Sequence, residues 1–363
     1  MMKMETEYVI EQFTLEDKDF GEFAKLITSA FLADGTAQEE GATIVFSENT
    51  FRMMFGAPSV DRNLFVKATY KKTKEIVGFL GAIPRELKIV DEKYKFVMPS
   101  WLCVHSDHQR KGLATVMGEK LFSICVEANY QGAFSLFEPK QHGKDVSRVV
   151  ADIKNIIIKR IISTDKFVIR VIDAEKISQV VKVNWYEKLA FKIIQKIPKV
   201  ENNHLRLHKK SDADRMFNLL MEHVERNQLS IVPKKKDFLW VLRQPGVNCV
   251  VYTNSDDEVK GFILAWEFNL AGFGYHYPCG WLDTVHIHGL TNKEAKKLAQ
   301  FLSYTSKQRG WIAIQTPYIP YFDSKPLRRA KFILYPQTLS LDMMLVKDID
   351  IPEKVDSFYF DWR

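Results

Sequence analysis

The chain has 363 residues and a formal net charge of +7, and 46% of its residues are hydrophobic and 12% aromatic. This composition excludes disordered and fibrous proteins and supplies enough apolar surface for two domains. The positive charge suits an anionic ligand, but lysine and arginine are spread along the chain, which argues against a nucleic-acid groove. Four distant cysteines without a Cys-x-x-Cys pair fit a reducing, cytoplasmic location and predict no metal site.

The sequence contains no signal for insertion into a membrane. No apolar run of 18 residues occurs, and the N-terminal stretch MMKMETEYVIEQ carries charges where a secretory signal needs an apolar core. We therefore expect a cytoplasmic protein without stable membrane insertion.

The first half of the chain predicts strands that alternate with helices. Strands are expected over Tyr8–Phe13, Leu64–Tyr70, Ile76–Pro84, Glu86–Val90, Lys95–Val104 and Gly132–Phe137. Helices are expected over Leu15–Phe31 and Ala114–Ala128. The segment Ala33–Ser47 is polar and contains glycine, which predicts a mobile loop. Residues 138–180 give no clear pattern.

The second half repeats part of the first. Glu75-Ile-Val-Gly-Phe-Leu returns as Glu258-Val-Lys-Gly-Phe-Ile, 183 residues later, and each copy is followed by a strand with Trp-Leu, at Trp101 and at Trp281. A strand near Leu205 and helices over Asp212–Arg226 and Asn292–Arg309 complete the pattern. We expect an α/β (α+β) fold of two domains, 1–200 and 201–363, with mixed central sheets flanked by helices and pseudo-two-fold symmetry.

The stretch Gln109-Arg-Lys-Gly-Leu-Ala114 bends the chain from a strand into a helix. The first N–H groups of a helix have no partner and, with the helix dipole, attract anions. Gly112 lets the backbone approach a ligand closely, and Arg110 and Lys111 add positive charge. The turn is therefore interpreted as a cradle for a pyrophosphate.

This turn resembles the acyl-CoA signature of the Gcn5-related N-acetyltransferase superfamily, Gln/Arg-x-x-Gly-x-Gly/Ala. Further segments resemble protein N-myristoyltransferases, whose fold is a tandem of two such domains. Trp101-Leu-Cys-Val-His105 is similar to their Phe-Leu-Cys-Val-His, and Val77-Gly-Phe-Leu-Gly-Ala-Ile-Pro84 to their Val-Gly-Phe-Ile-Ser-Ala-Ile-Pro. The family's Arg-Ser-Lys-Arg-Leu-Ala turn differs from the turn here, which is closer to ordinary acetyltransferases.

The stretch His286-Ile-His-Gly-Leu-Thr291 that follows Trp281-Leu282 lacks the spacing of the first turn, so we infer one acyl-CoA site, in the first domain, with the second contributing to the acceptor groove. The remaining site residues are implied by the resemblance. The backbone N–H groups of Trp101 and Leu102 would form an oxyanion hole. The residues implied to bind acyl-CoA are Cys103, Val104, Gln109, Arg110, Lys111, Gly112, Leu113 and Ala114. The segment Ala33–Ser47 is expected to close over the acceptor. No metal is expected.

The C-terminal tail is aromatic, Phe358-Tyr-Phe-Asp-Trp-Arg363, and we expect it to be docked. In N-myristoyltransferases the terminal carboxylate is the base for the acceptor amine, which implies a catalytic role for Arg363 through its carboxylate. The Arg363 guanidinium can also pair with that carboxylate, in which case Asp361 is the alternative base.

Several residues keep two interpretations. Tyr186 stands in a segment similar to a Tyr-Glu-Lys-x-Gly-Phe helix of small acetyltransferases, whose tyrosine protonates the leaving thiolate, but it also suits a packed amphipathic helix. Asp173 lies either near the acceptor or at an ordinary helix N-cap. His286 and His288 form a His-x-His pair without a third metal ligand, and His105 is interpreted as a turn residue.

The leading functional expectation is an enzyme, an acyl-CoA-dependent N-acyltransferase that moves a myristoyl-like group to an N-terminal glycine of proteins. The first alternative is an acetyl-CoA-dependent acetyltransferase acting on a small amine or peptide. The second is a CoA-binding pseudoenzyme. Expected partners are myristoyl-CoA or acetyl-CoA and a protein or peptide N-terminus, with no nucleic acid, and the protein is expected to be a monomer.

Overall fold

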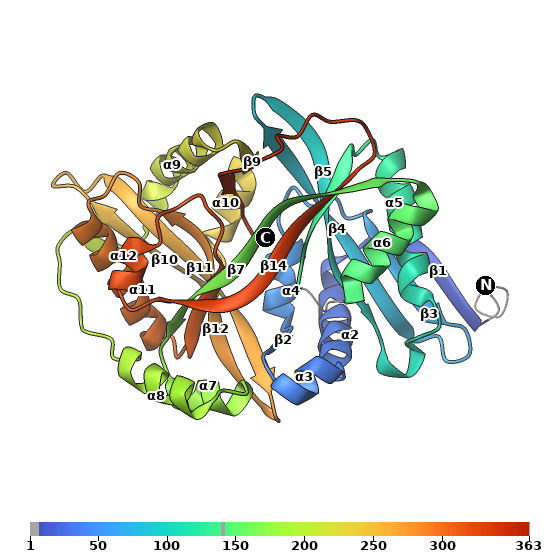
Figure 1. Ribbon diagram of the computed structural model, residues 1–363, viewed down its shortest axis with the longest axis horizontal. Helices are drawn as coiled ribbons and strands as arrows, with labels where there is room; N and C mark the ends of the chain where they lie inside the picture. Colours follow the sequence, from blue (N-terminus) through green and yellow to red (C-terminus); the bar gives the residue numbers. More distant parts are fainter. Residues whose placement is uncertain (1–6, 139–141, 363) are drawn as a thin grey trace. The chain divides into compact units, whose positions relative to one another are not determined.

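The computed structural model describes residues 7–138 and 142–362, which form two compact units (Figure 1). The first unit contains the N-terminal segment up to Asp34, Phe46–Thr164 and Thr338–Val355. The second unit contains Gly35–Val45, Asp165–Gln337 and the tail from Asp356. Each unit consists of a mixed sheet with helices on both faces, which confirms the expected fold class.

The sheet of the first unit has the strand order β1-β3-β4-β5-β6-β14. These strands are β1 (Tyr8–Phe13), β3 (Phe65–Tyr70), β4 (Ile76–Ile89), β5 (Glu92–Val104), β6 (Gly132–Phe137) and the second part of β14 (Ile333–Leu345). Neighbouring strands from β1 to β5 are antiparallel. Short turns join β3 to β4 and β4 to β5, and a helical segment returns the chain from β1 to β3. β6 is parallel to β5, since the helix α5 (Leu113–Glu127) connects them.

The two faces of this sheet carry different side chains, as the alternation along each strand requires. Val66, Ala68 and Leu80 pack with Met117 and other apolar residues of α5. The opposite face is covered by α2 (Phe20–Leu32) and α4 (Glu48–Phe55) (Figure 1). Six phenylalanine rings with at most 1% exposure fill the space on that side, namely Phe20, Phe23, Phe51, Phe55, Phe65 and Phe79.

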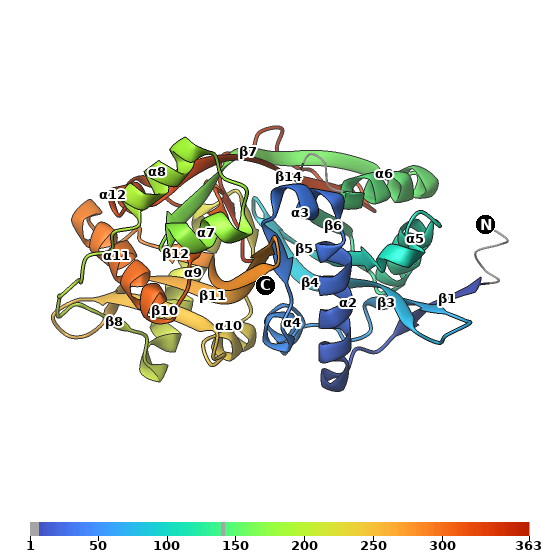
Figure 2. The same ribbon diagram turned by 90° about the horizontal axis from the view of Figure 1, so that it is seen from below.

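The second unit repeats this order as β8-β10-β11-β12-β13. These strands are β8 (Leu205–Leu207), β10 (Val247–Thr253), β11 (Val259–Gly272), β12 (Tyr275–His286) and β13 (Ala313–Pro317). The helix α11 (Asn292–Gln308) connects the parallel pair β12 and β13, as α5 does in the first unit. The helices α9 (Ala213–Arg226) and α10 (Lys235–Val241) can be followed on the other face in Figure 2. The internal repeat of the sequence therefore corresponds to a repeated fold.

Each sheet is completed by a strand from the other half of the sequence. In the first unit, β6 pairs with Ser340–Leu345 of β14. In the second unit, β13 pairs with Phe167–Val171 of β7 (Ile157–Val171). The compact units consequently differ from the expected domains 1–200 and 201–363, because residues 35–45 and 165–200 belong to the second unit and residues 338–355 to the first.

The remaining elements are short connections or peripheral helices. They are α6 (His142–Lys154), α7 (Ala174–Val180), α8 (Trp185–Ile194), β9 (Leu229–Ile231), α12 (Lys325–Arg329) and β15 (Phe358–Tyr359). Within the described ranges no helix combines the length and the apolar character that crossing a bilayer requires.

The segment predicted to be a mobile loop is ordered, so this prediction is wrong. It forms α3 (Gly35–Glu40) and β2 (Thr43–Val45), and β2 pairs with β11 of the second unit. The Ala42 amide donates to the carbonyl of Val180 at 2.8 Å. The backbone partners of this segment lie far along the chain. Hydrophobic periodicity describes only neighbouring residues, so it does not reveal these contacts.

Gly41 makes the attachment of this segment sensitive to substitution. Its φ is +73°, and a Cβ built on it would lie 2.2 Å from the carbonyl oxygen of Val180. Gly41→Ala is expected to lower the free energy of unfolding by about 2–4 kcal/mol, since it combines left-handed strain with a backbone clash. Chemical denaturation measures this loss.

The matched control is Gly274→Ala. Gly274 has φ +84°, and nothing lies within 4 Å of the position that an added methyl group would take, so it reports the conformational strain alone, about 1–2 kcal/mol. Equal losses for the two variants would contradict the clash at Gly41.

Candidate active site

The turn that joins β5 to α5 leaves the N-terminus of α5 open. Gly112 is the N-cap residue and has φ +82°, a left-handed conformation that favours glycine. The Gln109 side-chain amide donates to the carbonyl of Val104 at 3.0 Å, which holds the turn against the end of β5. No side chain of the described residues caps α5. Its first backbone N–H groups are therefore left for an anionic ligand.

Two cationic side chains accompany this turn. Arg110 and Lys111 are exposed, and the Lys111 ammonium donates to the Tyr8 hydroxyl at 2.9 Å, which raises the pKa of Lys111. The Tyr8 hydroxyl also lies 2.9 Å from Nδ1 of His108. Burial, followed by the charge of Lys111, lowers the pKa of His108. The turn thus places two positive charges beside open N–H groups, an arrangement suited to a pyrophosphate.

The pairing of β4 and β5 is interrupted by a bulge. Two residues of β5, Trp101 and Leu102, stand opposite one residue of β4, Leu80. Trp101 has φ +63°, which is unusual for a bulky side chain. A bulge of this kind turns backbone N–H groups out of the ladder. The bulge is present where the oxyanion hole was expected, and the catalytic role of the two amides stays a prediction.

β5 and β6 separate soon after they meet. Their parallel ladder consists of the pairs Phe96–Gly132 and Val97–Ala133, whereas β6 pairs with β14 along its whole length. From Met98 onward, the described part of β5 has no ladder partner on the β6 side. The opening leaves backbone groups of β5 for an extended ligand and runs from the bulge toward the α5 turn.

The residues expected to bind acyl-CoA differ in exposure. The side chains of Cys103, Val104 and Leu113 are buried in the first unit. Burial raises the pKa of the Cys103 thiol to about 12, so it stays neutral. These three residues present only backbone groups to a ligand. The exposed or half-buried residues of the set are Gln109, Arg110, Lys111, Gly112 and Ala114.

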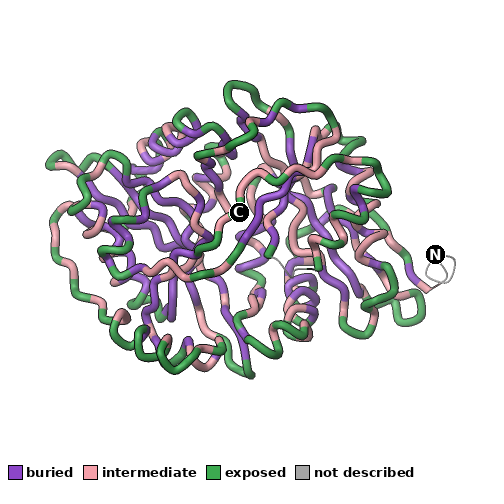
Figure 3. The backbone as a smooth tube through the Cα atoms, viewed as in Figure 1, coloured by how far each residue is buried: buried purple, intermediate pink, exposed green. Residues whose placement is uncertain are grey.

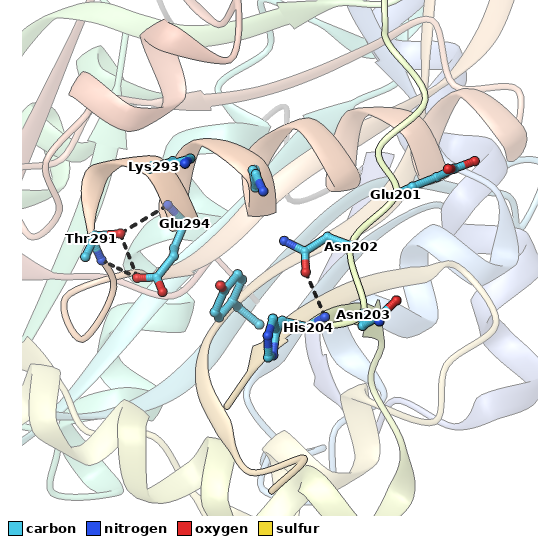
Figure 4. Close-up of a pocket in the computed structure, with 9 residues that line it drawn as sticks. Glu201, Asn202, Asn203, His204, Thr291, Lys293 and Glu294 are labelled. Atoms are coloured by element: carbon cyan, nitrogen blue, oxygen red, sulfur yellow. Dashed lines mark hydrogen bonds between the residues drawn. The ribbon is translucent and has the colours of Figure 1, made fainter. Parts of the chain in front are cut away.

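The equivalent helix of the second unit, α11, has an occupied N-terminus. The Thr291 hydroxyl accepts a hydrogen bond from the Glu294 amide at 3.3 Å, and the Glu294 carboxylate accepts one from the Thr291 amide at 2.7 Å. Figure 4 shows this reciprocal pair. Thr291 and Glu294 also line a hollow of about 630 Å³. A carboxylate at this place repels phosphate and takes the N–H groups that would bind it. This contrast agrees with the expectation of one acyl-CoA site per chain.

The second unit also has a bulge, but not where the sequence repeat places it. Trp281 and Leu282 are paired regularly with β11, and the extra residue of β12 is Asp283. The Trp-Leu pairs of the two halves are therefore not structurally equivalent, because the first lies in a bulge and the second precedes one.

The C-terminal tail docks beside this second bulge. Phe358–Phe360 are buried, the Trp362 amide donates to the Asp283 carboxylate at 3.1 Å, and the Trp362 ring lies 5.3 Å from that of Trp281. The expected docking of the tail is confirmed. Arg363 lies outside the described residues, so its carboxylate keeps the status of a prediction.

A buried histidine pair lies under the tail, and sequence reasoning missed it. Nδ1 of His286 is 3.0 Å from Nε2 of His223, and the His223 ring stacks on Tyr359 at 5.2 Å. Burial lowers the pKa of His223 to about 4 and that of His286 to about 3. Sixty-three residues separate the two histidines, so no local spacing points to the pair.

These neutral histidines predict acid sensitivity. Their pKa values are below the usual 6.5 in the folded chain, so the unfolded chain binds more protons as pH falls. The stability that a neutral buried histidine contributes is fully present above pH 6.5 and falls toward pH 4. For one histidine with a pKa of about 4 in the folded chain, the loss at pH 5 is about 2 kcal/mol. Urea unfolding at pH 7 and pH 5 measures this difference.

The double variant His223→Leu/His286→Phe should show a smaller loss between the two pH values. His276→Ala, which removes an exposed histidine, is the control and should keep the full loss. An unchanged pH dependence in the double variant would contradict the assignment.

Three other residues that the sequence singled out take structural positions. Asp173 is the N-cap of α7, where its carboxylate accepts two backbone N–H groups at 3.1 Å. His105 is a turn residue, whose Nδ1 accepts from the Asp107 amide at 3.4 Å. Tyr186 lies on α8 and is 56% exposed. Among residues 7–138 and 142–362, no three His, Cys, Asp or Glu side chains gather as a metal site would require.

Known proteins resemble this chain in sequence and in fold. Residues 1–135 match the family model "Myristoyl-CoA:protein N-myristoyltransferase, N-terminal domain". Glycylpeptide N-tetradecanoyltransferase of Plasmodium falciparum is 22% identical over 249 residues, which is 67% of this chain and 55% of the relative. The Drosophila melanogaster enzyme of that name is 23% identical over 274 residues, 73% of this chain and 53% of the relative. The chain thus spans about half the length of the curated relatives it matches.

The fold comparison covers nearly the whole chain. Saccharomyces cerevisiae N-myristoyltransferase with bound myristoyl-CoA superposes with a TM-score of 0.74 at 15% identity, over 98% of this chain and 86% of that structure. The chain therefore shares the fold of this structure, and each of its two units has the same order of strands. Its first 135 residues are similar in sequence to the N-terminal domain of N-myristoyltransferases.

Proposed function

We propose that the chain is an acyl-CoA-dependent N-acyltransferase that transfers a myristoyl group to the N-terminal glycine amine of proteins. The observation that carries the proposal is the succession of features along β5. The bulge at Trp101 is followed by an unpaired strand edge and then by the open N-terminus of α5 at Gly112. The similarity to proteins named glycylpeptide N-tetradecanoyltransferase supports this donor and acceptor.

In this proposal the residues of the first unit hold the donor. The open N–H groups of α5, with Arg110 and Lys111, bind the pyrophosphate of CoA. The pantetheine arm lies along the free edge of β5, and the thioester carbonyl reaches the bulge. The N–H groups of Trp101 and Leu102 then stabilise the oxyanion that forms there.

The reaction needs an unprotonated amine. When the amine nitrogen attacks the thioester carbon, a C–N bond forms, the C–S bond breaks, CoA leaves as its thiolate and the nitrogen gives up a proton. We assign the proton acceptor to a carboxylate of the tail, either that of Arg363 or that of Asp361.

The second unit is assigned to acceptor recognition. Its α11 N-terminus is closed by Thr291 and Glu294, and its bulge holds the tail that supplies the base. The proposal includes a monomer in the cytoplasm, and four buried cysteines without a disulfide support a reducing environment.

A short-chain acetyltransferase is the second candidate. The Gln109–Ala114 turn favours this candidate, because its sequence is closer to the turn of ordinary acetyltransferases than to the Arg-Ser-Lys-Arg-Leu-Ala turn of N-myristoyltransferases.

A chain-length series separates the candidates. The protein is incubated with acetyl-, octanoyl- or myristoyl-CoA and a peptide that begins with glycine, and the products are identified by mass spectrometry. Preferred transfer from myristoyl-CoA, lost when alanine replaces the first glycine, supports the proposal. Transfer of acetyl alone establishes the second candidate. Binding of CoA without any turnover identifies a pseudoenzyme and overturns both.

A further inference from the structure

The helix α8 of the second unit turns its apolar stripe outward. Trp185, Leu189 and Ile193 follow each other at intervals of four residues and therefore lie on one face. Their exposed fractions are 79%, 55% and 65%, and that of the adjacent Tyr186 is 56%. Figure 1 shows α8 at the lower edge of the second unit, and Figure 3 shows the same segment largely as exposed. A contiguous exposed patch of large apolar side chains marks an interaction surface.

The opposite face fixes this orientation. Phe191 is buried and anchors α8 to the second unit. The Glu187 carboxylate accepts from the Tyr335 hydroxyl at 3.1 Å and from the Asn184 amide at 2.8 Å, so one contact docks the helix and the other caps it. Because the polar and buried contacts lie on one side, the stripe cannot turn inward without breaking them.

Cationic side chains border the stripe. Residues 182–196 contain one acidic residue, Glu187, which points inward, and four exposed lysines. The lysines are Lys182, Lys188, Lys192 and Lys196, and none of them forms an ion pair within the described part of the chain. Lys188 and Lys192 lie on one flank of the stripe, at the spacing of one helical turn. The surface is therefore apolar in its centre and positive at its edge.

We propose that α8 binds flat to the surface of an anionic lipid bilayer. Trp185 and Tyr186 are residue types that prefer the interface between headgroups and acyl chains, Leu189 and Ile193 enter the apolar layer, and the lysines contact anionic headgroups. The helix has 10 residues and is about 15 Å long, half the thickness of the hydrocarbon layer, so it adsorbs and does not span.

The charges distinguish a bilayer from other occupants. Two copies of the chain joined through this stripe would bring two sets of unpaired lysines together, at an electrostatic cost. A nucleic acid would pair with the lysines but would leave the apolar side chains of the stripe exposed to water. An anionic membrane both pairs with the lysines and buries the stripe. This inference is independent of the proposed enzymatic function.

The test uses the whole protein and sedimentation with phosphatidylcholine vesicles that contain or lack phosphatidylserine. Binding is expected to the anionic vesicles and to weaken as salt is added. Leu189→Glu/Ile193→Glu and Lys188→Glu/Lys192→Glu should each reduce partitioning by about tenfold or more. A blue shift of tryptophan emission on binding should be absent in Trp185→Phe, because Trp185 is the side chain that enters the interface.

The matched control is Lys234→Glu/Lys260→Glu, which makes the same change in net charge at exposed lysines away from α8. It should leave binding within about twofold, since general electrostatic attraction alone is weaker than a local contact. Circular dichroism of each variant confirms that the fold is retained. The proposal is overturned if the wild-type protein ignores anionic vesicles, or if Leu189→Glu/Ile193→Glu binds as well as wild type. It is equally overturned if the control loses as much binding, or if the stripe mediates dimerisation in solution instead.

Discussion

Replacing Gly112 by glutamate is expected to abolish acyl-CoA binding. The N-terminus of α5 is open and flanked by Arg110 and Lys111. A glutamate places a carboxylate among the N–H groups that would hold the pyrophosphate, as Glu294 does at α11. Like-charge repulsion and steric exclusion should raise the Kd by about a hundredfold or more. Isothermal titration with CoA and with myristoyl-CoA measures the change.

The control for this variant is Gly274→Glu. Gly112 and Gly274 have φ values of +82° and +84°, so both substitutions introduce the same left-handed strain and the same charge. Gly274 lies between β11 and β12 of the second unit, whereas the α5 turn belongs to the first unit. Unchanged CoA affinity in Gly112→Glu would reject the site, and an equal loss in Gly274→Glu would attribute the effect to charge or strain alone.

Deleting Asp361–Arg363 should lower the rate of acyl transfer by about a hundredfold or more, because it removes the proposed base. Phe358–Phe360 remain and are buried, so the rest of the tail keeps its place. The proposed acyl-CoA site belongs to the first unit, so donor affinity should not change. Single-turnover rates and CoA titrations separate the two quantities.

Two further variants identify the base. Adding one glycine after Arg363 moves the terminal carboxylate while every side chain is kept, and Asp361→Asn removes the alternative. A rate loss in the extended chain alone assigns the role to the terminal carboxylate, and a loss in Asp361→Asn alone assigns it to the side chain. Full activity of the truncated chain would refute catalysis by the tail.

The features that the sequence predicts well are the local ones. The α5 turn needs six consecutive residues, and the conformation of Gly112 follows from its own lack of a side chain. The strand expected over Leu64–Tyr70 likewise agrees with β3, Phe65–Tyr70. The repeat at Gly78 and Gly261 predicts the repeated strand order, since each half must bury the same kind of sheet.

The features that the sequence does not predict depend on distant partners. The segment Gly35–Val45 has too few apolar residues to be read as structured, yet β11 supplies its backbone hydrogen bonds. The pair His223–His286 and the contact of Trp362 with Asp283 join elements that no spacing relates. The sequence of α8 is typical of a helix, but which of its faces is exposed depends on the distant residues that bury Phe191.

β14 completes the sheet of the first unit and β7 that of the second, so each sheet needs a strand from the other half of the sequence. This arrangement has a consequence for synthesis of the protein on the ribosome. Phe137 of β6 lies 203 residues before Ser340, with which it pairs. At about 5–20 residues per second, translation takes roughly 10–40 s to cover that distance. During this interval β6 has an unpaired edge, which is a site for aggregation. The nascent N-terminal half is therefore a natural client for chaperones, and fragments divided near residue 200 would each lack a strand and should not fold alone.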